Sequence, residues 1–484
     1  MASYELVVIG SGPAGHHAAV QAAKLGRRVA IIERLSCVGG VCINTGTIPS
    51  KTLREAVLYL SGFSQRGLYG HSYRVKQAIT IHDLMFRCHH VIQKENDVYR
   101  AQFARNRIDV LEGHATFVDP HSVKVEGTGG TALIQADQFV IATGTVPAVS
   151  PDVPVDGTAI IDADGIFGLA AVPGTMIVVG AGVIGMEYAC MFATLGAQVT
   201  VVETRKRLLE FADGEIIEAL MYHMRENRVA FRCGEFVERV ERDPAGGVTA
   251  YLKSQKTLHA DVLLYAVGRQ GNTATLGLEA AGLEADARGR IRVNGNFQTT
   301  VPHIYAAGDV IGFPSLASVS MEQGRVASAG AFGIPTVTVP ALFPYGLYTI
   351  PEISFVGRTE EELTNASVPY EVGMAHYREI ARGQIIGDTT GRLKILFHME
   401  TGALLGVHVI GEGAAELVHI GQAVMALGGT IRYFAEQVFN YPTLAECYKV
   451  AALAGLNKLG RERAAAIAPA LPQQDPSFLL GHPR

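Results

Sequence analysis

The chain has 484 residues, of which 48% are hydrophobic and 54 are glycine, and this predicts an α/β protein of about three domains, because single cores seldom grow beyond ~250 residues. Its formal net charge of −5 gives no electrostatic basis for binding nucleic acid or an anionic membrane, and no apolar run reaches the ~18 residues that a membrane span needs. Six cysteines over this length are too few for a disulfide scaffold, so we expect a reducing, cytoplasmic environment, and the N-terminal segment shows no secretory signal pattern.

The first predicted element is a buried strand that ends in a glycine-rich turn. Residues 7–9 are Val-Val-Ile, and Gly10, Gly12 and Gly15 follow with the spacing GxGxxG, ahead of an alanine-rich helix. A second apolar strand then ends at Glu33. This order predicts a dinucleotide-binding unit: Gly12 lets the backbone approach a pyrophosphate, Gly15 lets the helix pack on the strand, and the carboxylate accepts ribose hydroxyls.

The same design recurs 170 residues later in the chain. Gly180, Gly182 and Gly185 follow a second apolar run, and the next β-rich stretch ends at Glu203. A single GxGxxG can be a structural turn, but two in register, each with its strand, helix and acid, favour a duplicated unit. The sequence therefore predicts a chain that holds two dinucleotides at once, as a hydride relay requires.

The remaining segments complete this organisation. A helical stretch is expected at about 51–105, and an apolar strand at 138–142 returns the first unit to its nucleotide site. From about 340 the pattern changes to strands and helices without a phosphate loop. We predict a first dinucleotide-binding domain in two parts, at residues 1–150 and 274–339, and a second dinucleotide-binding domain at 151–273. An interface-forming domain is expected at 340–460 and a disordered tail at 461–484.

Two further motifs point to a family. Residues 39–51 read GGVCINTGTIPSK and residues 305–309 read YAAGD. Together with the glycine motifs, they resemble the flavoprotein disulfide reductase family over about residues 4–460. The resemblance implies an α/β fold with two Rossmann-like domains, FAD on the first and NAD or NADP on the second, and a C-terminal α+β dimerisation domain that makes the protein a homodimer or higher homo-oligomer.

The resemblance also implies individual contacts. The helix that begins near Leu316 is expected to aim its N-terminal amides at the flavin, and Asp309 to bind the ribityl chain. The remaining implied FAD contacts are Arg34, Gly39, Gly40, Cys42, Thr47, Lys51, Ala115, Thr143, Gly144 and Ala317. For the nicotinamide dinucleotide, Val237 and Gly268 join the second glycine loop and Glu203.

The sequence departs from this family where thiol chemistry takes place. Disulfide reductases carry two cysteines in the redox turn, but here only Cys42 is present and position 47 is threonine. Cys37 and Cys42 have the family's spacing but lie five residues out of register, so a packed thiol beside the flavin is favoured over a redox pair. The family's proton-shuttling histidine is replaced by Tyr441, a poor general base at neutral pH.

The branch of the family that shows these replacements catalyses transhydrogenation. The resemblance implies that NADPH and NAD+ exchange hydride reversibly through FAD, in a ping-pong reaction at one nicotinamide site. It also implies that Lys51 lies near flavin N5 and pairs with Glu187, and that this cation stabilises the electron-rich flavin. A surface ion pair is the alternative for these two residues.

The use of both nicotinamides poses a problem at Glu203. A carboxylate at this position favours a free ribose hydroxyl and repels a 2′-phosphate. However, residues 204–207 are Thr-Arg-Lys-Arg, and the guanidinium of Arg205 suits a phosphate. The alternative is that these cations only form a solvated loop.

Other interpretations remain open. A NAD(P)H:quinone or dye reductase would need an open pocket on the flavin face opposite the nicotinamide. A non-catalytic FAD-bound redox sensor would use Cys37 or Cys42 as its switch. His82, Cys88, His89 and His90 could suggest a metal, but their positions fit one face of a helix, so no metal site is predicted.

Overall fold

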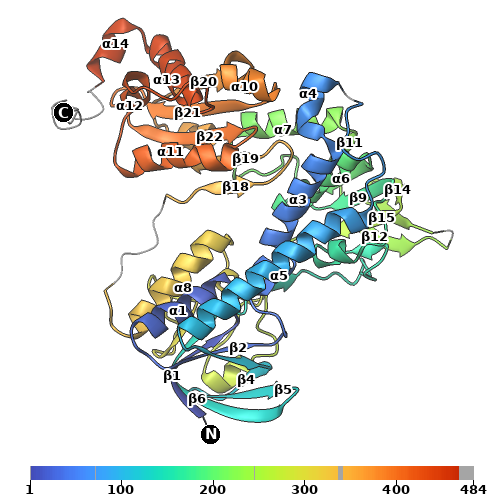
Figure 1. Ribbon diagram of the computed structural model, residues 1–484, viewed down its shortest axis with the longest axis vertical. Helices are drawn as coiled ribbons and strands as arrows, with labels where there is room; N and C mark the ends of the chain where they lie inside the picture. Colours follow the sequence, from blue (N-terminus) through green and yellow to red (C-terminus); the bar gives the residue numbers. More distant parts are fainter. Residues whose placement is uncertain (1, 71, 245, 336–341, 468–484) are drawn as a thin grey trace, which may run out of the picture.

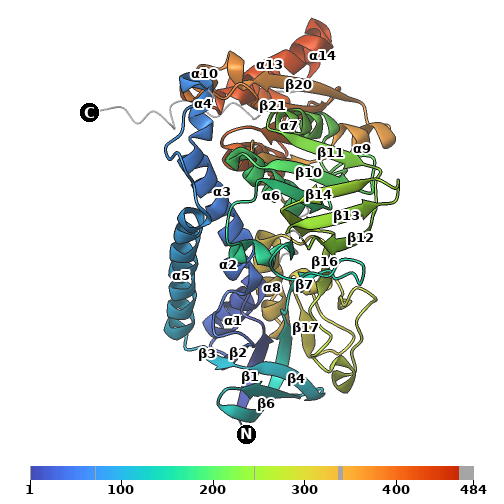
Figure 2. The same ribbon diagram turned by 90° about the vertical axis from the view of Figure 1, so that its right-hand side faces the viewer.

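The computed structural model describes residues 2–70, 72–244, 246–335 and 342–467, which form three packed α/β units. Figure 1 shows the first unit, with the N-terminus, at one end of the molecule and the third unit at the other. The second unit lies beside the third, and the helix Thr47–Ser61 of the first unit runs along the second unit (Figure 2). Among the helices that the structure describes, none combines the length and apolar character needed to cross a bilayer.

The first unit is built on a sheet with the strand order β3-β2-β1-β6-β5-β4, to which β17 adds beside β6. Strands β1, β2, β3, β6 and β17 are parallel. Their central apolar residues, at 6–9, 29–32, 139–141 and 304–306, are buried on both faces, as is typical of a doubly wound sheet, whereas Val110 on the edge strand β3 is exposed. The strands are β1 (Ala2–Ile9), β2 (Val29–Glu33), β3 (Asp109–Glu112), β4 (His114–Asp119), β5 (Ser122–Gly127), β6 (Gly130–Ile141) and β17 (Ile304–Ala306). The helices are α1 (Pro13–Lys24), α2 (Gly40–Asn44), α3 (Thr47–Ser61), α4 (Arg66–Tyr69), α5 (Ile81–Arg105) and α8 (Ala317–Ala331).

Segments far apart in the sequence meet in this unit. Ile304 to Ala306 pair in parallel with Phe139 to Ile141, so the chain returns to the first sheet after the second unit. Helix α8 packs closely on α1, where a Cβ at Gly324 would collide with the carbonyl of Ala14. The N-terminal turns of both helices line the same cleft.

The second unit repeats this plan with a five-stranded parallel sheet. Its strand order is β11-β10-β9-β15-β8, and a three-stranded antiparallel sheet, β12-β13-β14, lies beside it. The elements are β8 (Ile160–Ile161), β9 (Thr175–Val179), α6 (Val183–Leu195), β10 (Gln198–Glu203), α7 (Gly214–Glu226), β11 (Val229–Cys233), β12 (Val237–Arg242), β13 (Val248–Leu252), β14 (Thr257–Ala260) and β15 (Val262–Tyr265). Two short antiparallel strands, β7 (Thr145–Pro147) and β16 (Arg269–Gly271), join this unit to the first.

The third unit is an antiparallel sheet of order β18-β19-β22-β21-β20, with α11 and α13 packed against it. Its elements are β18 (Tyr345–Leu347), β19 (Ile353–Gly357), α9 (Glu360–Asn365), β20 (Tyr370–His376), α10 (Ala381–Ile386), β21 (Arg392–His398), β22 (Leu404–Ile410), α11 (Ala414–Ala426), α12 (Ile431–Glu436), α13 (Glu446–Leu459) and α14 (Arg461–Ala466). Neither of the two GxGxxG motifs lies in this unit.

Two expectations from the sequence differ from the structure. The helical stretch at 51–105 is two long helices, because α3 ends at Gly62 in a left-handed conformation and α5 begins only after the capping box of Thr80. The tail predicted from residue 461 is wrong at its start, since Arg461–Ala466 form α14 and Arg432 donates hydrogen bonds to the carbonyls of Ala464 and Ile467. The rest of that tail, 468–484, lies outside the described residues.

Candidate active site

The first glycine loop lines a cleft at the N-terminus of α1. Gly10 has a φ of 102° and sits against the carbonyl of Ala142, and a Cβ at Gly15 would collide with the carbonyl of Gly10. Gly15 therefore packs the helix on the strand rather than lining the cleft. Gly39 is also outside the lining, and its N–H donates to Ser11 Oγ at 2.9 Å. The other predicted FAD contacts that line this cleft are Gly10, Gly12, Glu33, Arg34, Gly40, Cys42, Thr47, Ala115, Thr143, Gly144, Asp309 and Ala317.

Glu33 is held in place at the end of β2. Its Oε2 accepts hydrogen bonds from the backbone N–H and the hydroxyl of Ser11, at 3.1 and 2.6 Å. Its Oε1 accepts the N–H of Leu35 at 3.1 Å. Since a carboxylate oxygen has further lone pairs, Glu33 can still accept a ribose hydroxyl at the cleft.

Three features of this cleft fit a dinucleotide. A Cβ at Gly12 would meet no protein atom within 4 Å, so the helix N-terminus opens onto free space, as a pyrophosphate requires. The hydroxyl of Thr143 is buried and has no hydrogen-bond partner among the described residues. Burial raises the pKa of Asp309, and the charge of Arg269 and the hydroxyls of Ser320 and Thr145 oppose this shift. A ligand with phosphates and hydroxyls would meet all three groups.

The second glycine loop lines a larger cavity of about 1120 Å³. A Cβ at Gly182 would also point into open space, and Gly185 packs against the carbonyl of Gly180 as Gly15 does against Gly10. The predicted residues that line this cavity are Lys51, Gly180, Gly182, Glu187, Glu203, Arg205, Val237 and Gly268. The two clefts meet, because residues from the redox turn and from the N-terminus of α8, among them Thr47, Asp309 and Ala317, line both.

Glu203 and Arg205 pair with each other at the edge of this cavity. The guanidinium of Arg205 donates through Nε and Nη2 to the two carboxylate oxygens, each at 3.0 Å, and the N–H of Ala181 donates to Oε2 at 2.8 Å. Burial alone would raise the pKa of Glu203, but the hydrogen bonds from Arg205 and Ala181 outweigh it and lower the pKa to about 2. Of the neighbouring cations, Arg207 pairs instead with Glu361 at 2.7 Å and does not line the cavity.

Lys51 and Glu187 form an ion pair where the three units meet. Lys51 Nζ lies 2.6 Å from Glu187 Oε2, and the side chains are 25% and 4% exposed. Glu187 sits on α6, a helix that is buried almost throughout because it is apolar on every face. Its other oxygen accepts the N–H of Tyr348 at 2.9 Å, and Lys51 Nζ lies 4.9 Å from the centre of the Tyr348 ring. This is a partly buried pair rather than a surface one.

The redox turn carries one thiol. Burial raises the pKa of Cys42, while its hydrogen bond with Thr47 opposes the shift, so the group is a thiol at neutral pH. Burial also raises the pKa of Cys37, which lies in the loop after β2. All six cysteines of the chain are free.

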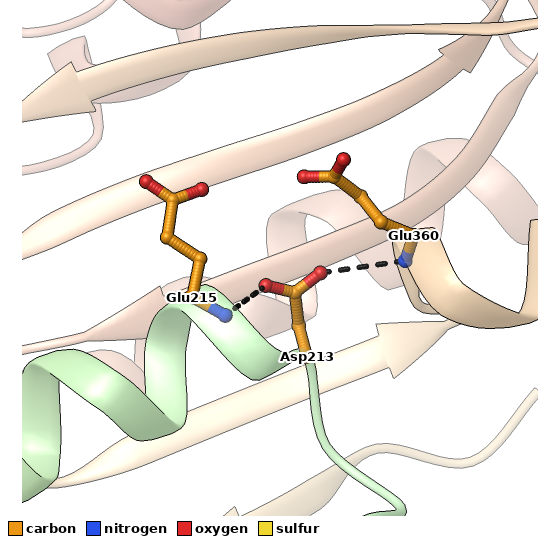
Figure 3. Close-up of side chains that lie close together, drawn as sticks. All are labelled: Asp213, Glu215 and Glu360. Atoms are coloured by element: carbon orange, nitrogen blue, oxygen red, sulfur yellow. Dashed lines mark hydrogen bonds between the residues drawn. The ribbon is translucent and has the colours of Figure 1, made fainter. Parts of the chain in front are cut away.

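Among the described residues, one acidic group has its carboxylates close enough together to hold a cation: Asp213, Glu215 and Glu360 (Figure 3). The ammonium of Lys394, 1% exposed, contacts all three, at 2.8 Å from Asp213 and 3.1 Å from Glu215. A protein cation therefore offsets part of the charge of these three carboxylates, and it joins the second unit to the third. On α5, His82, His89 and His90 are exposed, whereas Cys88 is buried against the carbonyl of Pro49.

Two residues that support the site, Tyr348 and Arg269, could not be assigned to it from the sequence. Tyr348, which holds Glu187, lies 161 residues away along the chain. Arg269 donates to the hydroxyl and the carbonyl of Thr145, at 2.8 and 2.9 Å, and so fixes the wall shared by the two clefts. Tyr441 does not reach either cleft and is 72% exposed.

Comparisons with known proteins agree with this architecture. Residues 4–324 match the family of the pyridine nucleotide-disulphide oxidoreductases, and residues 343–452 match the dimerisation domain of these proteins, which supports a homo-oligomer. Proteins named soluble pyridine nucleotide transhydrogenase, from Mycobacterium bovis and Colwellia psychrerythraea, are 56% and 47% identical over 461 residues, or 95% and 94% of this chain and 98% of each relative.

Two solved structures share the fold over 94% of this chain and 99% of their own length. The Cu(II) complex of the HOCl-induced flavoprotein disulfide reductase RclA from Escherichia coli has a TM-score of 0.85 at 29% identity. LpdA from Mycobacterium tuberculosis has a TM-score of 0.86 at 27% identity. The chain belongs to the pyridine nucleotide-disulphide oxidoreductase family.

Proposed function

We propose that this protein transfers hydride reversibly between NADPH and NAD+, giving NADP+ and NADH, through a tightly bound FAD. When bound, FAD would supply a two-electron carrier between one nicotinamide and the other. Relatives up to 56% identical carry the name soluble pyridine nucleotide transhydrogenase, and they match this chain over nearly its whole length.

The observation that carries the proposal is Thr47 at the junction of the two clefts. A disulfide reductase needs a second thiol there, but a hydroxyl forms no disulfide, and Cys42 beside it stays protonated. This turn therefore has no pair of thiols that could accept electrons from the flavin. Since one cavity carries the second glycine loop, both nicotinamides use it in turn, which is a ping-pong scheme without a redox-active disulfide.

Lys51 and Glu187 are the residues we assign to hydride transfer. Lys51 lines the nicotinamide cavity on the helix that follows the redox turn, and Glu187 fixes its position through the 2.6 Å ion pair. A fixed cation in a partly buried site favours negative charge that develops nearby, and it needs no rearrangement during transfer.

Glu203 and Arg205 allow one site to take both dinucleotides. With NADH, Arg205 stays on Glu203, and the carboxylate accepts a ribose hydroxyl. With NADPH, the side chain of Arg205, 48% exposed, turns outward to the 2′-phosphate. The ion pair therefore limits the repulsion that a free carboxylate would exert on the phosphate.

The remaining assignments belong to the same proposal. FAD is held by the residues of the first cleft together with the packing glycines Gly15 and Gly39, and the domain boundaries up to residue 460 are those expected from the sequence. The location is the cytoplasm, where the six free cysteines stay reduced.

The direct test is anaerobic turnover of NADPH with thio-NAD+, followed by the absorbance of reduced thio-NAD. We expect sustained turnover without any disulfide substrate. Reduction of the flavin without formation of reduced thio-NAD would overturn the proposal, because the acceptor would then be a different compound.

A further inference from the structure

Arg54 is a buried cation on α3 that lies close to the candidate site without lining it. The residue is 6% exposed, and it follows Lys51 by three positions, so both side chains leave the same face of the helix. Arg54 lines neither the FAD cleft nor the nicotinamide cavity. Its role is therefore to be sought in the protein groups that it holds.

The guanidinium of Arg54 uses all three of its nitrogens. Nε donates to the carbonyl of Thr349 at 3.0 Å, and Nη2 lies 3.4 Å from Oε2 of Glu352. Both partners belong to the third unit and are buried. Nη1 lies 2.8 Å from Glu55, whose side chain is 51% exposed, so this pair is weak. Arg54 therefore ties α3 to residues 348–352 of the third unit.

The same segment of the third unit also holds Glu187. The N–H of Tyr348, the residue before Thr349, donates to Glu187 Oε1 at 2.9 Å. The other oxygen of Glu187 pairs with Lys51 at 2.6 Å. The contacts close on themselves, because Arg54 and Lys51 lie on the same helix. We call this set the contact network: Lys51, Arg54, Glu187, Tyr348 and Thr349.

We propose that Arg54 is a positioning residue for hydride transfer. By holding the carbonyl of Thr349, it keeps the N–H of Tyr348 directed at Glu187. The carboxylate in turn keeps Lys51 at the nicotinamide cavity. Without Arg54 the segment can move, Glu187 loses a hydrogen bond, and the cation is less firmly fixed when negative charge develops beside it. The inference rests on the proposed function, which assigns Lys51 to hydride transfer.

The first test removes Arg54 without leaving its buried partner charged. In Arg54→Met/Glu352→Gln the new amide can still accept the N–H of Ala415, which Glu352 accepts at 3.1 Å. Stopped-flow reduction of the flavin over a range of NADPH concentrations separates the limiting rate from the Kd. We expect the limiting rate to fall about tenfold, the effect of one hydrogen bond to a charged group. The Kd should change by less than about twofold, because Arg54 does not line the cavity.

A double-mutant cycle shows whether Arg54 acts through Lys51. In a Lys51→Met background the cation is already absent, so the change at Arg54 and Glu352 should slow flavin reduction by less than about twofold. Equal losses in both backgrounds, or no loss in the native background, would overturn the inference. A Lys51→Met variant that reduces its flavin at the native rate would overturn it as well.

Hydrogen exchange reports on the contact network without turnover. In the oxidised holoenzyme, exchange at the amide of Tyr348, followed by mass spectrometry, should become at least tenfold faster in Arg54→Met/Glu352→Gln. Arg54→Lys keeps the charge but not the planar fork, so it should show an intermediate effect on exchange and on the reduction rate. This variant also decides the matter if the double variant does not fold. Unchanged exchange in both would contradict the inference.

The matched control is Glu55→Gln, which removes only the exposed partner of Arg54 and should change neither the exchange nor the reduction rate. Flavin reduction by NADPH is the first half of the proposed reaction. If the wild-type protein reduces its flavin but never thio-NAD+, the proposed function fails, and the Arg54 variants still decide the inference. If transhydrogenation is sustained and these variants match the wild type, the inference alone fails.

Discussion

Variants of the ion pair between Lys51 and Glu187 are expected to separate its effect on stability from its effect on catalysis. Lys51→Met removes the cation and leaves the Glu187 carboxylate, 4% exposed, with the N–H of Tyr348 as its remaining partner. Breaking a buried pair costs about 3–5 kcal/mol, because an uncompensated charge stays in a poorly solvated place. Since the bond to Tyr348 persists, we expect the free energy of unfolding to fall by about 3 kcal/mol.

The double variant Lys51→Met/Glu187→Gln removes both charges and keeps an acceptor for the N–H of Tyr348. It should recover most of the lost stability, because a neutral amide is far cheaper to bury than a carboxylate. The rate of flavin reduction by NADPH should behave differently. We expect it to drop on the order of 100-fold in both variants, since both lack the cation that stabilises the developing charge.

Urea unfolding of the holoenzyme measures the stability, and stopped-flow absorbance of the flavin measures the reduction. Lys76→Met is a matched control: Lys76 lies at the same 2.6 Å from Asp83, but the pair is at the surface, so little change is expected in either quantity. If the double variant recovered the reduction rate together with the stability, the cation would have no catalytic role and this reasoning would be refuted.

Three other changes test separate parts of the structure. Arg205→Ala should raise the KM for NADPH about 10-fold to 100-fold, because a charged hydrogen bond is lost, and should change the KM for NADH by less than about threefold. The control Arg207→Ala, outside the cavity, should alter neither KM, and equal losses for both nucleotides would contradict the phosphate role. Thr47→Cys places a second thiol beside Cys42, so air oxidation should remove two free thiols that the wild type retains, and an unchanged thiol count would contradict the contact between these positions. Burial lowers the pKa of His16 to about 4 in the folded chain, against 6.5 for an unperturbed histidine, so the unfolded chain binds more protons between these pH values, and the free energy of unfolding should fall as pH drops from 6.5 to 4. The slope of stability against pH should be smaller in His16→Phe, and equal slopes would show that His16 is not buried as a neutral ring.

The parts of the fold that the sequence predicts best are those set by local backbone chemistry. Gly10 and Gly180 adopt positive φ and sit against carbonyls of a neighbouring strand, and Gly15 and Gly185 allow close packing of helix on strand. These requirements are steric, and the packing of Gly15 and Gly185 lies within one βαβ unit, so the motif alone indicates it. The sequence also indicates that the chain returns to the first unit near residue 304, because a short apolar strand precedes Gly308 and Asp309.

The parts that the sequence does not predict are set by contacts between units. Glu203 and Arg205 can be identified as nucleotide ligands, but their pairing with each other depends on side-chain conformation. The support that Tyr348 gives to Glu187 crosses from the second unit to the third. The break between α3 and α5 depends on the positive φ of Gly62, in a stretch whose hydrophobic pattern alone suggests one helical region.

The central claim is that hydride passes through the flavin from one nicotinamide to the other. A double-mixing experiment tests it: one equivalent of NADPH first bleaches the flavin anaerobically, and thio-NAD+ is added after NADP+ has been removed. The account predicts that flavin absorbance returns at the same rate at which reduced thio-NAD appears, in equal amounts, and at least as fast as steady-state turnover. A flavin that stays bleached, or that recovers without forming reduced thio-NAD, would contradict it.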